Sequence, residues 1–434
     1  MSLPSLRALP IAAALALTAC PRGPSPGQAE QLSSFDYAWT RVRDTYPDPD
    51  FHGLDWSAIG DELRPRAAAA RDAAELRPVL EDLFSRLGDS HFGVIPGGLA
   101  PPAPRGADGA DADEVHIGGR GEVGLDLRLI DGALIVCRVN PGGAAERAGV
   151  RTGWRLTRIQ HTDVAVLLDA LGPEGAARSG RGVALARMSG PPGAALHLEL
   201  TDGQGQLQSA DLVRQETQAP WVTLGSLPPM PVHFESEVLP GGVGVIRFDL
   251  FMEPVPQRFT PAMGALLAAG VTGMVLDMRG NPGGVAPMAM GLAGHFFSER
   301  GLSLGTLRFR DATLKLVINP RAERFDGPLA VLVDHLSASS SEILAAGLQK
   351  LGRARVFGEQ SAGMALPSTW EELPNGDLIQ FVTADFTDPT GARVEGAGVI
   401  PDVNVPWTTE ALLAGQDPAL EAALAWLRSA PATP

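Results

Sequence analysis

The chain has 434 residues, which is more than one ordinary domain and predicts two or three. Its 50 acidic and 35 basic residues give a formal charge of -15, which argues against nucleic acid or an anionic membrane surface as a partner. Apolar residues make up 44% of the chain, enough for large cores, and the abundant glycines and prolines form no repeat, which excludes a fibrous or wholly disordered chain.

Residues 1–20 have the layout of a secretory signal peptide. Arg7 precedes an apolar run, residues 11–19, that is too short to span a membrane. The run ends in Leu-Thr-Ala-Cys at Cys20, which resembles the bacterial lipobox, where cleavage before the cysteine leaves a lipidated N-terminus. We therefore expect a bacterial lipoprotein outside the cytoplasm, on the periplasmic or cell-surface side, associated with the membrane only through a lipid on Cys20. An ordinary signal peptide cleaved elsewhere is the alternative.

Residues 21–34 show no apolar periodicity and predict a flexible tether. Helical periodicity begins at Phe35 and predicts an N-terminal helical domain over residues 35–95. Apolar residues share a helix face in two segments, Phe35, Trp39 and Val42 in the first and Leu76, Val79, Leu80, Leu83 and Leu87 in the second. Residues 96–114, rich in proline, glycine, alanine and aspartate, predict an exposed linker.

The motif Gly-Asp-Ser-His-Phe-Gly at residues 88–93 places His91 just after a helix end. A lone histidine in such a place is usually a structural hydrogen bonder, but a serine nucleophile needs a base whose pKa is near the working pH, and histidine most often supplies it. The other histidines show no metal-ligand spacing. We therefore expect neither a metal nor a cofactor.

Residues 115–217 predict a domain of short strands with turns between them. The strand start Gly124, Leu125, Asp126 and Leu127, the connection at residues 140–149, and the strand at residues 153–159 resemble a PDZ domain. Such domains add a peptide as an extra strand and hold its terminal carboxylate with main-chain N–H groups. Trp154 departs from the pattern, which usually carries aspartate there. A purely structural β domain is the alternative, and Cys137 in one of its strands predicts a buried free thiol.

Residues 230–408 alternate strands and helices and predict an α/β domain, followed by a C-terminal helix and tail at residues 409–434. One predicted strand, residues 273–278, runs into Arg-Gly-Asn-Pro-Gly-Gly, in which Gly283 and Gly284 either form a plain turn or expose N–H groups to a developing oxyanion. The sequence contains no Walker or dinucleotide fingerprint.

A second strand, residues 329–333, leads through four serines into a predicted helix that starts at Ser341. A helix N-terminus exposes free N–H groups and favours negative charge, which suits an attacking hydroxyl and its oxyanion. The serines are Ser337, Ser339, Ser340 and Ser341. A capping box formed by Ser339 and Glu342 is the simpler interpretation of the same residues.

The order of these motifs, closed by Glu-Gly-Ala-Gly-Val-Ile-Pro-Asp at residues 395–402, resembles the carboxyl-terminal processing (tail-specific) serine peptidases and their tricorn-core relatives. The resemblance extends from Phe35 to Leu427. It implies a multidomain α+β fold: an N-terminal helical unit, a PDZ-like β domain, and a peptidase core with the ClpP/crotonase-like α/β fold.

By matching positions, the resemblance implies Ser339 as nucleophile, with an oxyanion hole from the N–H of Ser340 and of Gly283 or Gly284. The better-known branch of the family uses a lysine base, but Met364 stands at that position and cannot accept a proton. The tricorn-like branch uses a histidine preceded by a serine, together with a late glutamate, and Ser90, His91 and Glu395 match those positions. We therefore expect a Ser/His/Glu-type site with His91 as the base and no Ser–Lys dyad. His335 ranks below His91 as a base, and Asp277 and Arg279 are expected to organise the loop.

These motifs together predict a serine endopeptidase that acts on unfolded or C-terminally exposed polypeptides. The alternative, suggested by Met364, is a catalytically inactive lipoprotein scaffold that binds peptides through the PDZ-like groove.

Overall fold

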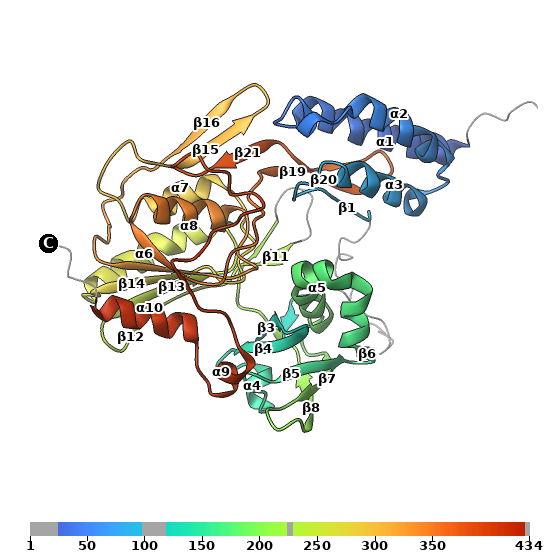
Figure 1. The fold of residues 1–434 in the computed structure, drawn as a ribbon. Helices are drawn as coiled ribbons and strands as arrows, with labels where there is room; N and C mark the ends of the chain where they lie inside the picture. The colour runs from blue at the N-terminus through green and yellow to red at the C-terminus, as the bar shows by residue number, and fades with distance from the viewer. Residues whose placement is uncertain (1–24, 98–118, 224–228, 430–434) are drawn as a thin grey trace, which may run out of the picture.

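A computed structural model describes residues 25–97, 119–223 and 229–429 of the chain (Figure 1). The predicted signal peptide with Cys20 lies outside the described residues, as does nearly all of the predicted linker. None of the helices in the described ranges is both long enough and apolar enough to cross a membrane.

The N-terminal unit consists of three helices and a small sheet. The helices are α1 (Pro26–Thr45), α2 (Trp56–Ala69) and α3 (Ala73–Ser85), with a short 3₁₀ turn η1 (Phe51–Gly53) between the first two. The sheet joins β1 (Gly93–Ile95) to β20 (Leu378–Val382) and β19 (Ser368–Glu372), which come from much later in the chain. The hydrophobic core of the unit therefore combines residues from both ends of the sequence.

The predicted tether is wrong from residue 26 onward, because α1 begins at Pro26. Ser25 accepts a hydrogen bond from the N–H of Gln28, and the Gln28 side chain accepts one from the N–H of Ser25, which together form a capping box. Ser34 is buried and accepts a hydrogen bond from the N–H of Asn375. A polar side chain can face the interior of this helix bundle because its hydrogen bonds are satisfied.

The PDZ-like domain, residues 119–217, lies below the rest of the molecule in Figure 1. Its main sheet has the order β3 (Leu125–Ile130), β4 (Ala133–Val139), β5 (Arg155–Ile159), β7 (Ala195–Thr201) and β8 (Leu207–Val213), with β6 (Thr162–Asp163) also paired to β5. Beside it are β2 (Gly121–Glu122), β9 (Gln215–Glu216), the short helix α4 (Ala144–Arg147) and the long, kinked helix α5 (Val164–Met188). The sequence reasoning did not identify α5.

The core is a six-stranded sheet covered by helices on both faces. The strand order is β12 (Phe234–Leu239), β13 (Val243–Phe248), β14 (Gly273–Asp277), β17 (Leu329–Val333), β18 (Ala354–Gly358) and β22 (Val403–Asn404). All neighbours are parallel except β12 and β13. One face packs on α6 (Val255–Ala268), α7 (Pro287–Ala293) and α8 (Ser340–Lys350). The predicted α/β character of this region is therefore present.

Smaller strands complete the core. A three-stranded sheet has the order β16 (Thr313–Val317), β15 (Ser303–Phe309) and β21 (Ala384–Thr387), and β10 (Trp221–Val222) pairs with β11 (Met230–Pro231). The C-terminal residues then form α9 (Thr409–Leu413) and α10 (Pro418–Ser429). Helix α10 covers the second face of the main sheet.

Candidate active site

Ser339 lies where β17 ends and α8 begins. Because both faces of the sheet are covered, the strand before it is wholly buried, and it delivers the serines to the carboxyl edge of the sheet. Ser339 is the N-cap residue of α8 and has φ 53° and ψ -116°, a backbone conformation that residues with a Cβ rarely adopt. Its N–H donates to the Met364 carbonyl at 2.8 Å and to Glu342 Oε2 at 3.1 Å.

The other three serines of the cluster hold the glycine loop against the start of α8. Ser337 Oγ donates to the Met278 carbonyl at 2.8 Å, and Ser341 Oγ donates to the Asn281 carbonyl at 2.9 Å. Ser340 Oγ donates to the Gly284 carbonyl at 2.9 Å. These three hydroxyls are therefore engaged in structure, which separates Ser339 from its neighbours in a way that the sequence alone does not.

The glycines of the loop are required by close approach to Ser339. A Cβ on Gly283 would lie 2.7 Å from the Ser339 Cβ and 2.9 Å from the Ser340 nitrogen, and Gly283 has φ 99°. The N–H of Gly283 donates to Asn281 Oδ1 at 2.9 Å, so Gly284 is the predicted glycine that stays available as an oxyanion donor. Within the described ranges, the N–H groups of Gly284 and Ser340 have no acceptor. These two N–H groups, at the positive end of α8, suit a developing negative charge.

Glu342 organises the segment on the other side of Ser339. Its carboxylate is fully buried and accepts hydrogen bonds from the N–H groups of Ser339, Gly363 and Met364 and from Ser361 Oγ. Burial raises the pKa of Glu342, although these donors act in the opposite direction. The predicted pairing of Ser339 with Glu342 is present, because the Ser339 N–H donates to the Glu342 carboxylate. A capping role for this pair at the start of α8 is therefore compatible with a chemical role for the Ser339 hydroxyl.

A buried ion pair connects the PDZ-like domain to this loop, and the sequence reasoning did not anticipate it. Arg128 on β3 donates through Nε to Asp334 Oδ2 at 2.6 Å, and both side chains are 1% exposed. Asp334 Oδ1 in turn accepts the N–H of Gly280 at 2.8 Å. The guanidinium of Arg128 thus lies directly beside the glycine loop, and Asp334 links the two through hydrogen bonds.

Ser90, His91 and Glu395 are brought together from opposite ends of the chain. Glu395 accepts the N–H of Ser90 at 3.0 Å and the N–H of Ala365 at 2.8 Å, and Ser90 Oγ lies 2.8 Å from His91 Nδ1. Burial lowers the pKa of His91 to about 4, so its imidazole is neutral at physiological pH. The N-terminal unit therefore folds back onto the segment whose Met364 carbonyl receives the Ser339 N–H.

The remaining predicted groups are placed as follows. Arg279 pairs with Asp277 at 2.8 Å and with Asp417 at 2.7 Å, as expected for residues that organise the loop. His335 Nδ1 lies 2.8 Å from Glu359 Oε2. Gly124, Leu125, Asp126 and Leu127 form the start of β3, with Gly124 at φ 75°.

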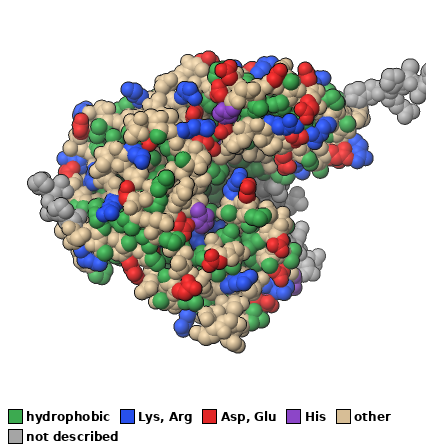
Figure 2. All heavy atoms as spheres, in the orientation of Figure 1, with side chains coloured by type: hydrophobic (Ala, Val, Ile, Leu, Met, Phe, Trp, Pro, Cys, Tyr) green, Lys and Arg blue, Asp and Glu red, His purple; other side chains and the backbone are tan. Residues whose placement is uncertain are grey.

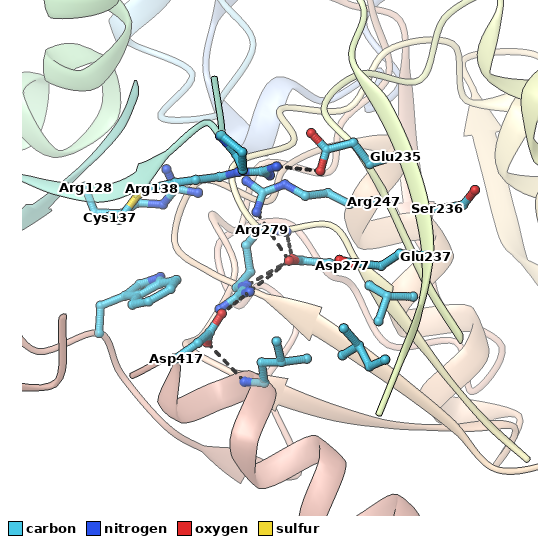
Figure 3. Close-up of a pocket in the computed structure, with 15 residues that line it drawn as sticks. Arg128, Cys137, Arg138, Glu235, Ser236, Glu237, Arg247, Asp277, Arg279 and Asp417 are labelled. Carbon is cyan, nitrogen blue, oxygen red and sulfur yellow. Dashed lines mark hydrogen bonds and ion pairs between the residues drawn. The ribbon is translucent and has the colours of Figure 1, made fainter. Parts of the chain in front are cut away.

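A cavity of about 320 Å³ opens between the PDZ-like domain, the core sheet and the C-terminal segment (Figure 3). Arg279 extends between Asp277 and Asp417 on one wall, and its guanidinium stacks 4.7 Å from the ring centre of Trp407. Arg138 of the PDZ-like domain pairs with Glu235 of the core at its other side. Ser339 does not line this cavity, so it belongs to the junction between the domains and not to the serine site.

Comparison with known proteins assigns the chain to a class. Residues 242–405 match the model of peptidase family S41, and residues 28–85 match that of the tricorn protease C1 domain. The carboxyl-terminal-processing protease of a Picosynechococcus species is 27% identical over 388 residues, which cover 85% of this chain and 82% of that protein. The chloroplastic C-terminal processing peptidase of Tetradesmus obliquus is 29% identical over 405 residues, which cover 88% and 79%.

Solved structures show the same multidomain α+β fold. The photosystem II D1 C-terminal processing protease has a TM-score of 0.58 at 23% identity, with 94% of this chain and 99% of that chain covered. A putative S41 protease from Bacteroides fragilis has a TM-score of 0.58 at 16% identity, with 91% and 97% covered. The fold and the matched core define a serine peptidase. Residues 242–405 therefore form a core of the peptidase family S41 type, and the chain is a homologue of the C-terminal processing proteases.

The match of residues 242–405 corrects the expected Ser/His/Glu-type site, because peptidase family S41 uses a Ser–Lys catalytic dyad. The expectation rested on Met364 at the position that the resemblance assigns to the lysine. The chain contains two lysines, Lys315 and Lys350. Lys350 ends α8, about 16 Å along the helix axis from Ser339, and Lys315 lies on the exposed strand β16.

Proposed function

We propose that this S41 peptidase cleaves peptide bonds in unfolded or C-terminally exposed polypeptides outside the cytoplasm, with Ser339 as its nucleophile. The observation that carries the proposal is the arrangement at the start of α8. Three of the four serines are hydrogen-bonded to the glycine loop or the residue before it, whereas Ser339 stands in a strained conformation beside two N–H groups that have no acceptor among the described residues. Its relatives are C-terminal processing proteases, which supports a polypeptide substrate.

In this proposal, Ser339 Oγ attacks the carbonyl carbon of the scissile peptide and forms a tetrahedral intermediate. The oxyanion accepts hydrogen bonds from the N–H groups of Gly284 and Ser340, aided by the dipole of α8. Collapse of the intermediate expels the amine, which carries away the proton that the Ser339 hydroxyl lost on attack. Water then hydrolyses the acyl ester, its oxygen adding to the acyl carbon and one of its protons returning to Ser339 Oγ. Ser90 and Glu395 act in positioning, because they tie the N-terminal unit to the segment beneath Ser339.

Labelling with a fluorophosphonate probe tests this proposal. We expect the wild-type chain to label and to hydrolyse casein, and Ser339→Ala to lose both activities while it keeps its thermal unfolding temperature. Ser209→Ala is the control, since it removes an exposed hydroxyl from β8 of the PDZ-like domain and should label. Equal labelling of wild type and Ser339→Ala would refute Ser339 as the nucleophile.

A second candidate function, a peptide-binding scaffold without catalysis, is favoured by Met364 and by the position of Lys350 at the far end of α8. A serine in this site needs a neighbouring group to accept its proton, and the amine of the family dyad is replaced here by a thioether. The scaffold predicts that the wild-type chain binds polypeptides without labelling or cleavage. Met364→Lys distinguishes the two candidates, because restored labelling in that variant alone shows that the site is intact apart from the missing amine.

The extracytoplasmic location is proposed from the signal-peptide pattern that ends at Cys20. We expect the chain expressed in a bacterium to incorporate a palmitate analogue and to fractionate with membranes. Cys20→Ala should lose the label. An N-terminus cleaved at a site other than Cys20, detected by mass spectrometry, would show an ordinary secreted protein.

A further inference from the structure

The strand expected to receive peptide carboxylates already carries a carboxylate of its own. Asp126 is the second residue of β3, and its Oδ1 accepts the N–H of the next residue, Leu127, at 2.8 Å. The ladder between β3 and β4 shifts register at the same point. The Leu127 N–H belongs to the group of main-chain donors that, in the proposed peptide-binding strand, would hold the end of a peptide.

Three guanidinium groups converge on the same carboxylate. Arg181 on α5 donates through Nε to Asp126 Oδ1 at 2.7 Å, and Arg128 donates through NH1 to Oδ2 at 2.9 Å. Arg247, from the core strand β13, lies 3.7 Å from Oδ2. The three arginines come from a strand and a helix of the PDZ-like domain and from a strand of the core. Such a cluster of guanidinium groups is typical of a site that binds an anionic ligand.

Strand β3 is also positioned to be extended. It lies at the end of its sheet, and within the described residues no strand pairs with its other edge. Helix α5 lies beside that edge, and the bond between Arg181 and Asp126 spans the space between helix and strand. A peptide that adds to β3 must therefore pass Asp126 and its partners.

We propose that Asp126 occupies the carboxylate-binding position of the PDZ-like domain and makes it select extended internal segments of polypeptide rather than free chain ends. This inference rests on the proposed function only in that the domain binds polypeptide. A terminal carboxylate would have to compete with Asp126 for the Leu127 N–H and the guanidinium groups, and it would meet a negative charge. An internal segment brings no such charge and still finds the edge of β3 with which no strand in the described ranges pairs.

Displacement of Asp126 by a peptide is disfavoured by the burial of its partners. The side chain of Asp126 is 14% exposed and that of Arg128 is 1% exposed. Although burial acts to raise the pKa of Asp126, Arg128, Arg181 and Arg247 hold that pKa well below its usual range, so the side chain is charged at every physiological pH. Moving it away would leave the Arg128 guanidinium with one carboxylate fewer in a buried site.

Fluorescence anisotropy tests the inference on the full-length chain carrying Ser339→Ala, so that bound peptide is not cut. The probe is a fluorescein-labelled dodecapeptide pool, randomised in its last three positions and made both as free acid and as carboxamide. We expect the parent to bind the two forms with dissociation constants within about twofold. Asp126→Ala should prefer the free acid by about tenfold or more, because it exposes the Leu127 N–H and the guanidinium groups.

Asp211→Ala is the matched control, since it removes an exposed carboxylate from β8 on the opposite edge of the same sheet and should leave the parent behaviour unchanged. If Asp126→Ala does not fold, Asp126→Asn keeps the side-chain volume and should show a smaller preference in the same direction. A parent that prefers the free acid by about tenfold overturns the inference. So does a folded Asp126 variant that treats both forms alike or binds neither. Fluorophosphonate labelling of Ser339 reports separately on catalysis, so the two proposals fail independently.

Discussion

The backbone of Ser339 is held in an unusual conformation by the residues packed around it. A non-glycine residue held at φ 53° destabilises the folded chain by about 1–3 kcal/mol, and this backbone conformation persists only where the surrounding residues impose it. Here the Ser339 N–H is fixed by Met364 and Glu342, and Gly283 closes the opposite side. The conformation therefore depends on a glycine at position 283, which leads to a direct test.

Gly283→Ala should abolish reaction at Ser339. The added Cβ would lie 2.7 Å from the Ser339 Cβ, so either the serine or the loop that carries Gly284 must move. We expect fluorophosphonate labelling to slow by about a hundredfold or more, as expected when oxyanion donors are displaced. Gly241→Ala is the control, because Gly241 has φ 94° and no atom within 4 Å of its added Cβ. If both variants label like wild type, Gly283 does not support the reactive geometry.

Arg128→Met should destabilise the chain strongly. It leaves Asp334 buried without its closest cation, and removing one member of a buried pair costs about 3–5 kcal/mol. Adding Asp334→Asn to the same chain should recover part of that loss, since an amide can still accept the N–H of Gly280. Arg158→Met, which breaks a partly exposed pair with Glu199, should cost less than about 1 kcal/mol. Urea unfolding measures all of these variants, and equal losses for Arg128 and Arg158 would contradict the prediction.

At the residue scale, the sequence located the serine cluster but could not explain how its members differ. Strand and helix periodicity placed all four hydroxyls at a helix start, and the choice of Ser339 came from the family resemblance. The distinction is physical, because Ser337, Ser340 and Ser341 bond to carbonyls of a loop about 60 residues earlier in the chain. Long-range partners of this kind have no periodic signature. Arg128 was missed for the same reason, since its partner Asp334 lies 206 residues away.

At the element scale, local pattern predicted elements well where one face is apolar and poorly where polar residues face inward. Strands β14 and β17 and the start of α8 all match their predicted positions closely. Helix α1 was missed at its start because its buried side chains there include Gln31 and Ser34. Helix α5 was missed because four glycines and a proline interrupt its pattern, and the chain kinks at Gly172.

Helix α9 ties the C-terminal segment to the PDZ-like domain. Leu412 is 2% exposed and packs with Ile130 and Ile135, and its carbonyl accepts a hydrogen bond from Thr152 Oγ1 at 2.8 Å. The segment then returns to the core sheet as α10. The PDZ-like domain is therefore attached to the core by this contact as well as by its two chain connections.

Leu412→Ala should loosen that attachment. Truncating a buried leucine typically costs about 2–5 kcal/mol, and the loss should be confined to α9 and the strands it covers. Hydrogen exchange followed by mass spectrometry should show faster exchange in residues 405–416 and in β3 and β4. Glu410→Ala, on the same helix, removes an exposed side chain and should change exchange much less. Unchanged exchange in the Leu412 variant would show that the contact does not hold the segment.

At the scale of the whole molecule, charged pairs and the small apolar contact around Leu412, rather than one shared core, join the domains. The three largest hydrophobic clusters belong to the core, the N-terminal unit and the PDZ-like domain separately. Between them lie pairs such as Arg128 with Asp334 and Arg138 with Glu235. In the view of Figure 2 the surface is hollowed between the upper part of the molecule and the PDZ-like domain below, and charges of both signs are scattered over it. The arrangement of the domains should therefore respond to pH and salt more than their individual cores do.

His233 also joins the core to the PDZ-like domain through charged groups, so part of the expected response to pH can be assigned to one residue. Its Nδ1 lies 2.6 Å from Asp249 Oδ2 of the core, and its Nε2 lies 3.4 Å from Glu122 Oε2 of the PDZ-like domain. Hydrogen bonds with Asp249 and with Glu122 raise the pKa of His233 to about 10. Two residues after Asp249, Phe251 pairs through its main chain with Gly283, so the junction also adjoins the glycine loop.

The stability that His233 contributes should be lost as the pH rises. Its folded pKa lies above the ordinary value of about 6.5, so the contribution is complete below pH 6.5 and declines as the pH approaches about 10. The unfolding temperature of wild type should therefore exceed that of His233→Gln most at pH 6.5, and the two should converge toward pH 10. The side chain is 36% exposed, so solvent screens the effect, and added salt should reduce it at the lower pH. His197→Gln, at an exposed pair with Asp211 within the PDZ-like domain, is the control. A difference between wild type and His233→Gln that stays constant from pH 6.5 to 10 would show that the charge on His233 does not hold the two domains together.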